Sequence, residues 1–433
     1  MNTSKPLKIG IAGLGTVGAH VFKLIQKNSD LLAKKGERAL VVTAVSSRDQ
    51  SKDRGIDVSD VTWFENALDL ASCDEVDVIV ETIGGSDGIA FELAKLSLES
   101  GKHFVTANKA LIALKGDYLL PIAEQNNVSL AFEAAVAGGI PIVKALREGL
   151  AGNEIQAVYG ILNGTCNYIL SQMWETGADF DCILKDAQDL GYAEADPSFD
   201  VDGVDAGHKL SILSALAFEG TPNFDAVNIQ GIRKIEAVDI AAAEELGYRI
   251  KLLGIAKRTA KGVEQSVEPC MVPVIAPIAT VEGSLNAVYV EGNFVGQTLY
   301  VGHGAGGGPT ASAVVADIID IARSHNINPF GIEFEQLGHL KIADMRERQG
   351  DFYLRLNVID KPGVIADVTA ILRDCNVSIR SVLQHGHAPE QPVPVVLTTH
   401  NTTEHDIKTA LTEIGQLKSI VEEPFLIRIE KLD

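Results

Sequence analysis

The sequence has 433 residues, more than one typical hydrophobic core accommodates, so two or three domains are expected. Its hydrophobic residues (46%) and charged residues (22%) lie near the averages for globular domains, which excludes the fibrous and disordered classes. A formal net charge of −21 argues against nucleic acid and anionic membranes as partners, because no broad basic surface is available to them.

Cysteine usage and the lack of long apolar runs bear on the compartment. The five cysteines are scattered and form no C-x-x-C pair, as expected for reduced thiols. No run reaches the roughly 18 apolar residues of a membrane span, and Met1 to Lys8 lacks the apolar segment of a signal peptide. We therefore predict a cytoplasmic location and no membrane span.

The first domain is expected over residues 1–150, where short β-rich runs alternate with helical patterns. This alternation is typical of an α/β fold with a doubly wound parallel sheet and crossover helices. The expected strands are Lys8–Ala12, Leu40–Ser46, Val76–Glu81, His103–Ala107 and Val128–Ala134. The clearest expected helices are Thr16–Lys35 and Phe91–Ser100.

A second region of mixed α+β character is expected over residues 151–325. Its expected strands are Ile155–Leu162 and Asn286–Val290, and its expected helices are Thr165–Glu175, Val204–Phe218 and Pro309–Ser324. Residues 326–350 lose clear periodicity and are interpreted as a linker with some helix.

The last domain, residues 351–433, follows the order strand, helix, two strands, helix and strand. This order predicts a ferredoxin-like βαββαβ unit, which is small for a second catalytic lobe and therefore suits regulation. The expected elements are Phe352–Val358, Val364–Cys375, Ser378–Gln384, Val393–Thr399, Glu404–Ile414 and Phe425–Ile429.

A glycine-rich turn follows the first expected strand and opens the first expected helix. Gly13, Gly15 and Gly18 form G-x-G-x-x-G, the fingerprint of a Rossmann-type dinucleotide site. These glycines allow a tight turn, close backbone approach to a pyrophosphate and close helix packing. Thr16 and Val17 begin the helix, whose N-terminal amides favour an anion.

The end of the second expected strand bears on the choice of dinucleotide. NAD sites usually place Asp or Glu there to bind the ribose hydroxyls, whereas this strand ends in Val45, Ser46, Ser47 and Arg48. Hydroxyls and a guanidinium suit a 2′-phosphate, so NADP is the preferred cofactor, with NAD also usable. The alternative is that Arg48 is an ordinary solvated surface charge.

A carboxylate-rich stretch leads into the expected helix 204–218. Asp205 and Lys209 lie at i and i+4, so a carboxylate and an ammonium share one helical face. Taken alone, this pair is most simply a solvated surface pair. The helix continues with many apolar residues, however, and five carboxylates crowd its approach, which predicts a buried polar pocket that binds a cation, an ammonium or a metal. The five carboxylates are Glu194, Asp196, Asp200, Asp202 and Asp205.

With these residues in place, the chain resembles the homoserine dehydrogenase family over roughly residues 7–325. The resemblance includes Glu194-Ala195-Asp196-Pro197 with Asp205 and Lys209, Ala107-Asn108-Lys109, and Leu162-Asn163-Gly164-Thr165-Cys166-Asn167-Tyr168. It implies that the first domain binds NAD(P) and that the second is a catalytic and dimerisation domain.

The resemblance also implies roles for single residues. Lys209 would be the general acid for the substrate carbonyl oxygen, and Asp205 would share its proton network. Lys109 would lie near the nicotinamide and the substrate, since it follows the carboxyl end of a sheet strand. Glu194 and Asp200 are the expected substrate-binding residues.

Two further sites follow from the resemblance alone. A monovalent cation, with sodium expected, would be bound by a carboxylate and backbone carbonyls at Glu133, Val136, Gly138 and Ile140. Gly306, in the glycine run before the helix at residue 309, would contact the cofactor. Without the resemblance, these segments read as a strand end and a helix-start loop.

The C-terminal unit resembles an ACT domain. Asp360 precedes a turn in which Gly363 opens a helix with bare backbone amides, and Asn376 follows that helix. Amides suit the carboxylate of an amino acid and Asp360 suits its ammonium, and the family analogy makes that ligand threonine. The alternative is a dimerisation module that binds no ligand.

These observations predict an NAD(P)-dependent oxidoreductase that interconverts L-homoserine and L-aspartate 4-semialdehyde in threonine, methionine and isoleucine biosynthesis. A homo-oligomer, either dimer or tetramer, is expected because exposed sheet faces need covering. Two alternatives remain at this point. One is an aspartate-semialdehyde dehydrogenase, which needs a nucleophilic cysteine, with Cys166 the candidate. The other is a non-enzymatic nucleotide- and amino-acid-sensing protein.

Overall fold

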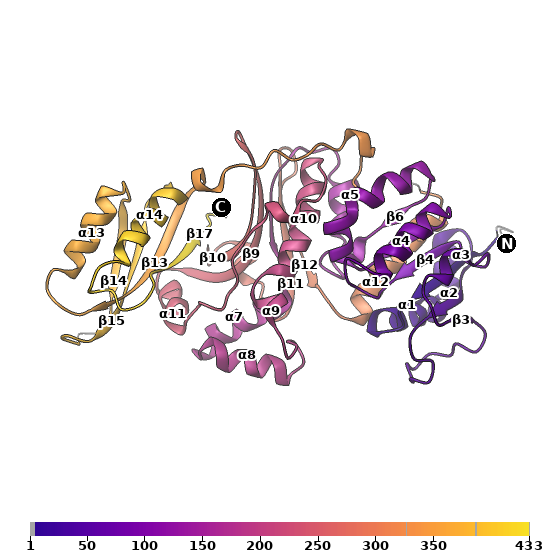
Figure 1. Ribbon diagram of the computed structural model, residues 1–433, viewed down its shortest axis with the longest axis horizontal. Coiled ribbons are helices and arrows are strands. Elements are labelled where there is room, and N and C mark those ends of the chain that lie inside the picture. Colours follow the sequence, from indigo (N-terminus) through magenta and orange to yellow (C-terminus); the bar gives the residue numbers. More distant parts are fainter. Residues whose placement is uncertain (1–4, 326, 386–387, 433) are drawn as a thin grey trace. The chain divides into compact units, whose positions relative to one another are not determined.

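A computed structural model describes residues 5–325, 327–385 and 388–432 and divides the chain into two compact units (Figure 1). Unit 1 comprises Met1–Gly164, Asp205–Val227 and Ser284–Leu340. Unit 2 comprises Thr165–Val204, Asn228–Gly283 and Lys341–Asp433. Asn326, the first residue of the expected linker, and the outermost residues of the first and last expected domains lie outside the described residues.

Unit 1 contains a six-stranded parallel sheet in the order β3-β2-β1-β4-β5-β6. This is the predicted doubly wound α/β fold. The strand order reverses beside β1, and open sheets of this kind bind ligands at that switch point, beyond the carboxyl ends of the strands. The strands are β1 (Leu7–Ala12), β2 (Leu40–Ser46), β3 (Thr62–Phe64), β4 (Val78–Glu81), β5 (His103–Thr106) and β6 (Leu130–Ala131).

Helices cover this sheet, and two of them, α1 and α12, pack directly on each other although they are distant in sequence (Figure 1). Their apolar faces form one hydrophobic core with β1 and β2, centred on residues such as Ile11, Val21 and Val314. Burial of this apolar surface is the main stabilising contribution. The helices are α1 (Thr16–Lys27), α2 (Ser29–Gly36), α3 (Asp69–Ser72), α4 (Ile89–Glu99), α5 (Lys109–Gln125) and α12 (Gly307–Ala322).

Two predicted elements of this region differ from the structure. The expected helix Thr16–Lys35 is interrupted at Asn28, where the backbone leaves helical geometry and a second helix begins. The expected strand Val128–Ala134 is reduced to β6 and is followed by the 3-10 turn η1 (Glu133–Ala135). The strand ends there because the Glu133 amide donates to the Asp317 carboxylate instead of to a neighbouring strand.

Unit 1 also contains an antiparallel group of three strands, in which β11 lies between β7 and β12. The helix α10 occupies the predicted bounds, and almost all of its side chains are buried. These elements are β7 (Ile155–Ile161), α10 (Val204–Phe218), β11 (Leu285–Gly292) and β12 (Gly296–His303), with the short segments α6 (Ile142–Lys144), η2 (Ala145–Gly149), η3 (Phe224–Ala226) and η5 (Phe334–Gln336).

Unit 2 is built on a mixed sheet in the order β9-β10-β17-β13-β15-β14. Its first part holds the long hairpin β9–β10, which the sequence patterns did not indicate. The elements of this part are α7 (Gly164–Thr176), α8 (Phe180–Asp189), α9 (Ser198–Val201), β8 (Asn228–Ile229), α11 (Ala237–Glu245), β9 (Tyr248–Thr259), β10 (Gly262–Pro273) and η4 (Pro277–Thr280).

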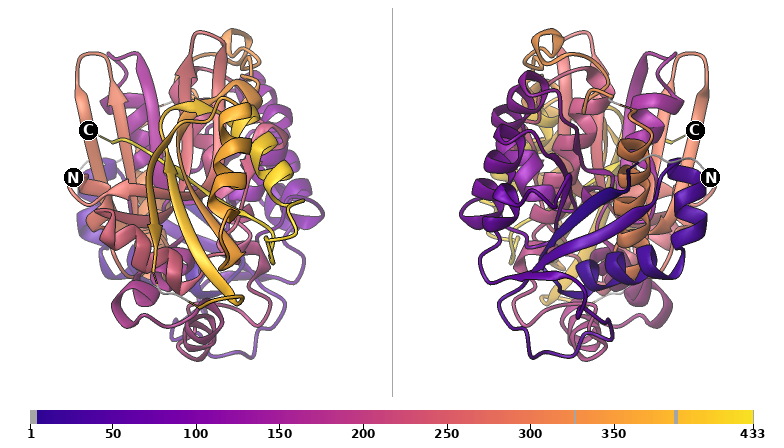
Figure 2. Two further views of the ribbon diagram at one scale, coloured as in Figure 1. Left: turned by 90° about the vertical axis from the view of Figure 1, so that its left-hand side faces the viewer. Right: turned by 90° about the vertical axis from the view of Figure 1, so that its right-hand side faces the viewer.

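The C-terminal part of unit 2 has the predicted βαββαβ order. Its two helices lie side by side on one face of its strands (Figure 2, left) and share a core that includes Leu356, Val368 and Ile407. The elements are η6 (Met345–Glu347), β13 (Gln349–Ile359), α13 (Val364–Asp374), β14 (Ile379–Gln384), β15 (Pro392–Thr399), β16 (Thr402–Thr403), α14 (Glu404–Ile414) and β17 (Phe425–Ile429).

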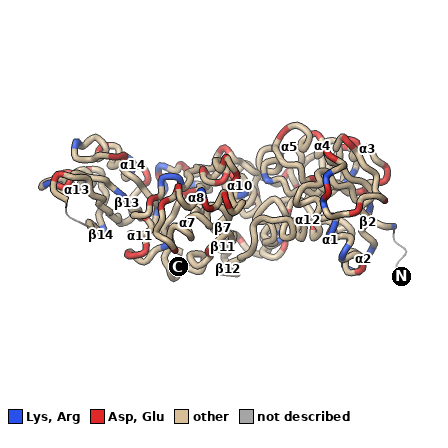
Figure 3. Tube along the Cα trace, turned by 90° about the horizontal axis from the view of Figure 1, so that it is seen from below, with Lys and Arg blue, Asp and Glu red and all other residues tan. Residues whose placement is uncertain are grey.

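The strand β17 has neighbours on both sides. It pairs antiparallel with β13 within the C-terminal part and parallel with β10, through Cys270 opposite Arg428. The C-terminal βαββαβ unit is therefore continuous with the β9–β10 hairpin in one sheet. Acidic and basic residues are interspersed along the chain (Figure 3), and among the described residues no helix is both long and apolar enough to cross a membrane.

Candidate active site

The G-x-G-x-x-G turn has a separate physical reason for each glycine. Gly13 adopts φ +95°, and a Cβ on Gly18 would lie 1.9 Å from the Gly13 carbonyl oxygen, so neither position accepts a side chain. A Cβ on Gly15 would meet no protein atom within 4 Å. Packing therefore explains the first and third glycines, whereas the second leaves open space for a ligand at the start of α1. Thr16 and Val17 supply the first backbone amides of that helix.

Arg48 lies just after β2 with its side chain exposed, and Ser46 before it is buried. A second arginine, Arg54, was not singled out from the sequence. Its guanidinium donates to the Leu14 carbonyl inside the glycine turn (2.9 Å) and to the Ser47 hydroxyl (2.9 Å). Arg54 thus fixes the loop that carries Arg48 beside the dinucleotide turn. Only the fold of that loop reveals this contact, since the sequence shows Arg54 as one of several charged residues.

The centre of the candidate site is a carboxylate that holds two ammonium groups. Asp205 Oδ2 accepts from Lys209 Nζ at 2.7 Å, and Asp205 Oδ1 lies 2.9 Å from Lys109 Nζ. Lys209 Nζ also donates to the Leu162 carbonyl at 2.7 Å. Lys109 comes from the start of α5, directly after β5, and the other two charges come from α10. The structure therefore brings together the three residues predicted to carry the chemistry.

Electrostatics keep this centre charged. Burial alone would raise the pKa of the Asp205 carboxyl, but the ammonium groups of Lys209 and Lys109 outweigh burial and hold that pKa well below its usual range. The Asp205 side chain is 5% exposed and that of Lys209 11%, whereas that of Lys109 is 32% exposed. The cluster carries one net positive charge and is open on the Lys109 side, so it can attract and polarise an anionic or carbonyl ligand.

The other predicted carboxylates belong to unit 2 and are less buried than expected. Of the five crowded carboxylates only Asp205 is buried; Glu194 and Asp196 are exposed, and Asp200 and Asp202 are partly exposed. The burial expected for the polar pocket therefore holds for Asp205 but not for the approach loop. Two of these carboxylates have individual partners: Asp202 pairs with Arg233, and Asp196 accepts from the Ser198 amide.

The loop that carries Glu194 is anchored at both ends by the first turn of α7. The Thr165 hydroxyl donates to the Tyr192 carbonyl (2.8 Å), and the Cys166 thiol donates to the Asp200 carbonyl (3.2 Å). Cys166 is buried and its thiol serves this backbone contact. These contacts assign Cys166 to loop anchoring, and they disfavour the nucleophilic cysteine that an aspartate-semialdehyde dehydrogenase needs.

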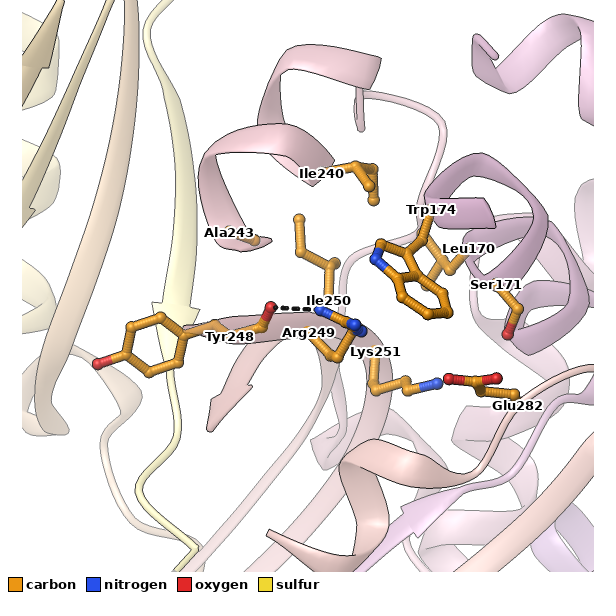
Figure 4. A pocket seen from close by; sticks show the side chains of 10 residues that line it. All are labelled: Leu170, Ser171, Trp174, Ile240, Ala243, Tyr248, Arg249, Ile250, Lys251 and Glu282. Atoms are coloured by element: carbon orange, nitrogen blue, oxygen red, sulfur yellow. Dashed lines mark hydrogen bonds between the residues drawn. The ribbon is translucent and has the colours of Figure 1, made fainter. Parts of the chain in front are cut away.

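A buried lysine of β9 supports the same turn and was not predicted. Lys251 Nζ donates to the Val281 carbonyl (2.6 Å) and to Asn167 Oδ1 (3.2 Å), and burial lowers the pKa of Lys251 to about 8. Figure 4 shows the small pocket that it lines, where Arg249 stacks on the Trp174 ring at 3.8 Å. Because Asn167 belongs to the 162–168 motif, Lys251 contributes to the placement of α7. A lone lysine within a strand carries no sequence signal for this role.

The expected cation turn has an unusual backbone. Ala137 and Gly138 both have positive φ, and a Cβ on Gly138 would lie 2.3 Å from the Gly304 carbonyl oxygen. The Glu133 carboxylate accepts from the amides of Val143 (2.9 Å) and Lys144 (2.8 Å). Both of its oxygens are therefore engaged at the start of α6. Among the described residues, no group of three or more His, Cys, Asp or Glu side chains could hold a metal ion.

The second glycine turn lies against the helix of the dinucleotide motif. Gly306 caps α12 with φ +111°, and a Cβ on the next residue, Gly307, would lie 2.4 Å from the His20 ring on α1. The His20 ring contacts the Thr16 carbonyl at 2.7 Å. The α12 turn and the start of α1 are thus neighbours, as expected if both face one cofactor.

The predicted regulatory residues lie around the start and end of α13. Gly363 caps α13 with φ +96°, and Asn376 follows the helix with φ +58°. Asp360 Oδ2 accepts from the Ala388 amide at 2.9 Å, so one carboxylate oxygen already has a backbone partner. Gly363 and Asn376 are exposed and Asp360 is partly exposed.

Comparison with known families agrees with this geometry. Residues 141–319 match the homoserine dehydrogenase family, and residues 13–133 match the family's NAD-binding domain. Residues 352–419 match the ACT domain. A homoserine dehydrogenase of Neisseria gonorrhoeae is 46% identical, with 99% of each chain covered. The chain belongs to the homoserine dehydrogenase family.

Solved structures of homoserine dehydrogenases have the same fold. A homoserine dehydrogenase from Thiobacillus denitrificans superposes with a TM-score of 0.93 at 43% identity, covering 99% of both chains. A hyperthermophilic archaeal homoserine dehydrogenase, solved in complex with NADPH, gives a TM-score of 0.62 at 29% identity and covers 73% of this chain and 97% of its own. The predicted fold class, with a parallel Rossmann-type sheet, a mixed α+β catalytic region and a C-terminal ACT domain, is confirmed.

Proposed function

We propose that this member of the homoserine dehydrogenase family interconverts L-homoserine and L-aspartate 4-semialdehyde through the Lys109–Asp205–Lys209 cluster. The observation that carries the proposal is the single buried carboxylate that accepts from both lysines, with Lys209 2.7 Å and Lys109 2.9 Å away. A sensor that only binds nucleotide and amino acid has no need of a buried, positively charged centre of this kind.

In the reducing direction, NAD(P)H supplies the hydride that adds to the carbonyl carbon of the semialdehyde. The Lys209 ammonium donates a proton to the carbonyl oxygen, which stabilises the negative charge that develops there. Among the described residues, Lys209 has two hydrogen-bond acceptors, Asp205 and the Leu162 carbonyl, so one of its three N–H groups can point at the substrate. In the oxidising direction the same amine accepts the proton from the homoserine hydroxyl.

Lys109 and Glu194 are assigned to substrate. Lys109 is the most exposed member of the cluster and begins a helix at the carboxyl end of β5, where the nicotinamide and substrate would meet. Glu194 has an exposed carboxylate that suits the substrate ammonium, and Asp200 is the second candidate in that loop.

The test is reduction of NADP or NAD by L-homoserine, followed by nicotinamide absorbance. Lys209→Ala should lower kcat by about 10²-fold to 10⁴-fold, the usual contribution of general acid–base catalysis, with little change in KM for the cofactor. Lys8→Ala, which removes a lysine paired with Glu75 on the surface, is the matched control and should keep full activity. Wild-type kcat in folded Lys209→Ala enzyme would reject the assignment.

For the cofactor, NADP is proposed as the preferred form. Arg48 lies after β2, where an acidic residue would favour NAD, and Arg54 adds a second positive charge on the same loop. A related homoserine dehydrogenase was solved with NADPH. NAD remains a usable alternative because the serine hydroxyls can also bind ribose hydroxyls.

A monovalent cation, sodium as the expected ion, is proposed at the turn of residues 133–140. The Glu133 carboxylate is engaged by two amides, so the backbone carbonyl oxygens of Glu133, Val136, Gly138 and Ile140 are the fitting ligands. The tight turn with two positive φ values can direct carbonyls toward one point. Activity titrated with sodium chloride against a choline chloride control tests this proposal.

Threonine is proposed as the ligand of the ACT domain, with Asp360, Gly363 and Asn376 around it. Deleting the domain is a poor test, because β17 pairs with β10 and its removal would expose that strand. Asp360→Ala in the full chain should instead weaken threonine inhibition while the uninhibited rate stays unchanged. Retained inhibition would favour the alternative, an ACT domain that only assembles subunits into the proposed dimer or tetramer.

A further inference from the structure

The two residues after β7 contact both members of the ion pair on α10. The Leu162 carbonyl accepts from Lys209 Nζ at 2.7 Å, and the next residue, Asn163, donates from its side-chain Nδ2 to Asp205 Oδ2 at 2.8 Å. Asn163 is 5% exposed and Leu162 is fully buried. A backbone acceptor thus meets the ammonium, and an amide donor meets the carboxylate.

The contact with Asn163 distinguishes the two oxygens of Asp205. Oδ2 accepts from both Asn163 and Lys209, whereas Oδ1 accepts from Lys109 at 2.9 Å. A carboxylate can turn about its Cβ–Cγ bond, because that torsion is broad. The fixed amide donor at one oxygen restricts this rotation and so sets the plane of the carboxylate. Both lysines then meet a carboxylate of defined orientation.

We propose that Asn163 is a positioning residue for the reaction. By fixing the plane of the Asp205 carboxylate, it holds the Lys209 ammonium so that the remaining N–H faces the substrate oxygen. This inference rests on the proposed roles of Lys209 and Asp205. It adds a residue that acts through Asp205.

A purely structural role for Asn163 predicts a different outcome. Loss of a buried amide would then lower the melting temperature, leave kcat of the folded enzyme intact, and act independently of Asp205. A positioning role lowers kcat, leaves KM for NADP unchanged, and depends on Asp205 being present. The two roles therefore differ in both the kinetic split and the coupling.

The experiment compares Asn163→Ala and Asn163→Asp with Asn153→Ala. Asn163→Asp keeps the side-chain shape but cannot donate, so both variants should lose about 10-fold to 100-fold in kcat, as expected for one hydrogen bond to a charged group. Asn153 is the control because its side chain also joins two backbone segments, through the Val295 amide and the Leu150 carbonyl. Its variant should keep wild-type kcat.

A double-mutant cycle completes the test. In the Asp205→Ala background, Asn163→Ala should lower kcat by less than about twofold further, because its target is gone. The inference would be overturned if Asn163→Ala lowered kcat as much in the Asp205→Ala background as in the wild type. It would also be overturned if both Asn163 variants kept wild-type kcat. If Asp205→Ala and Lys209→Ala are themselves fully active, the proposed function fails instead, so the two failures can be told apart.

Discussion

Two buried ion clusters, one in each compact unit, differ in the sign of their net charge and in how far they are enclosed. In unit 1, Asp205 holds two lysines, and the Lys109 side chain is 32% exposed. In unit 2, Arg348 pairs with Glu264, Glu268 and Glu430, and its side chain is 2% exposed. The first cluster carries one net positive charge and is accessible at Lys109. The second, which also includes Arg428, has one carboxylate more than it has cations, and none of its side chains is more than 15% exposed.

The pKa shifts of the two clusters reflect this difference. At Arg348, burial opposes the charged form, but Glu268 and Glu430 outweigh it and raise the arginine pKa above its usual range. Glu268 shows the converse: burial would raise its pKa, and Arg348 and Arg428 lower it. The two arginines and the three glutamates of this cluster thus hold one another in the charged form. A buried charge cluster therefore indicates a reactive site only when one of its charged members is accessible, as Lys109 is with a side chain 32% exposed.

The largest effect on stability is expected at Arg348. Replacing it with methionine removes an ion-pair partner from three buried or partly buried carboxylates and leaves Arg428 as the one cation of the cluster, which should cost about 3–5 kcal/mol in free energy of unfolding. Because the cluster connects β10 with the residues just before β13 and just after β17, the loss should loosen the C-terminal domain. Thermal and urea unfolding, followed by circular dichroism, measure it.

Lys209→Met provides the matched comparison. Asp205 keeps Lys109 as a partner in that variant, so we expect a small change in melting temperature and a large loss of kcat. Arg348→Met should show the opposite pattern, a large fall in melting temperature and near-normal kcat in the protein that remains folded. Equal melting temperatures for Arg348→Met and wild type would break the distinction between the two clusters.

A third buried cluster, formed by Glu133, Asp317 and Lys144 in unit 1, has more carboxylates than cations, so its contribution to stability should depend on pH. Burial, and then the neighbouring Asp317, raise the pKa of Glu133 to about 7, while burial raises that of Asp317 to about 6 despite Lys144. Because both folded-state pKa values exceed the unfolded ones, the folded state binds protons more tightly. Its stabilising contribution is complete below about pH 4 and is lost as pH rises through 6 to 7.

Glu133→Gln isolates this effect. The variant has no charge at this position at any pH. Its free energy of unfolding relative to wild type should therefore increase as pH rises from 5 to 8, by up to about 3 kcal/mol, and its melting temperature should rise relative to wild type in parallel. The amide also keeps one acceptor for the Val143 and Lys144 N–H groups. A difference between the two proteins that does not change with pH would show that Glu133 is charged throughout this range.

How far the sequence predicts the structure depends on the range of the interactions. The helix 204–218 was predicted with its observed bounds because local features set both ends, with positive φ at Gly203 and at Glu219. The βαββαβ order was also predicted from local patterns. The pairing of β17 with β10 was not, because strand partners distant in sequence leave no local signal.

The same limit holds for the site. The i, i+4 spacing placed Asp205 beside Lys209, and the position of Lys109 after a strand suggested its side of the sheet. Asn163 and Arg54 were missed as functional neighbours, because their contacts depend on how separate segments meet in three dimensions. The predicted burial of the approach loop was wrong for a related reason: a run of carboxylates indicates charge but not which side chain the fold encloses.

The smallest effect is expected at an exposed charge, which solvent screens more strongly than it screens the two buried clusters. Arg48→Ala should raise KM for NADP by about 10-fold and leave KM for NAD nearly unchanged, because one exposed guanidinium contributes about 1.4 kcal/mol to binding a 2′-phosphate. The effect should shrink with added salt, whereas the loss at Lys209 should not, because bulk ions screen exposed charges far more than buried ones. Steady-state kinetics with both cofactors at low and high ionic strength measure this. An equal change in KM for NAD would show that Arg48 maintains the structure of the loop and does not bind the 2′-phosphate. Arg54, which donates to Leu14 and Ser47, would then be the residue that selects NADP.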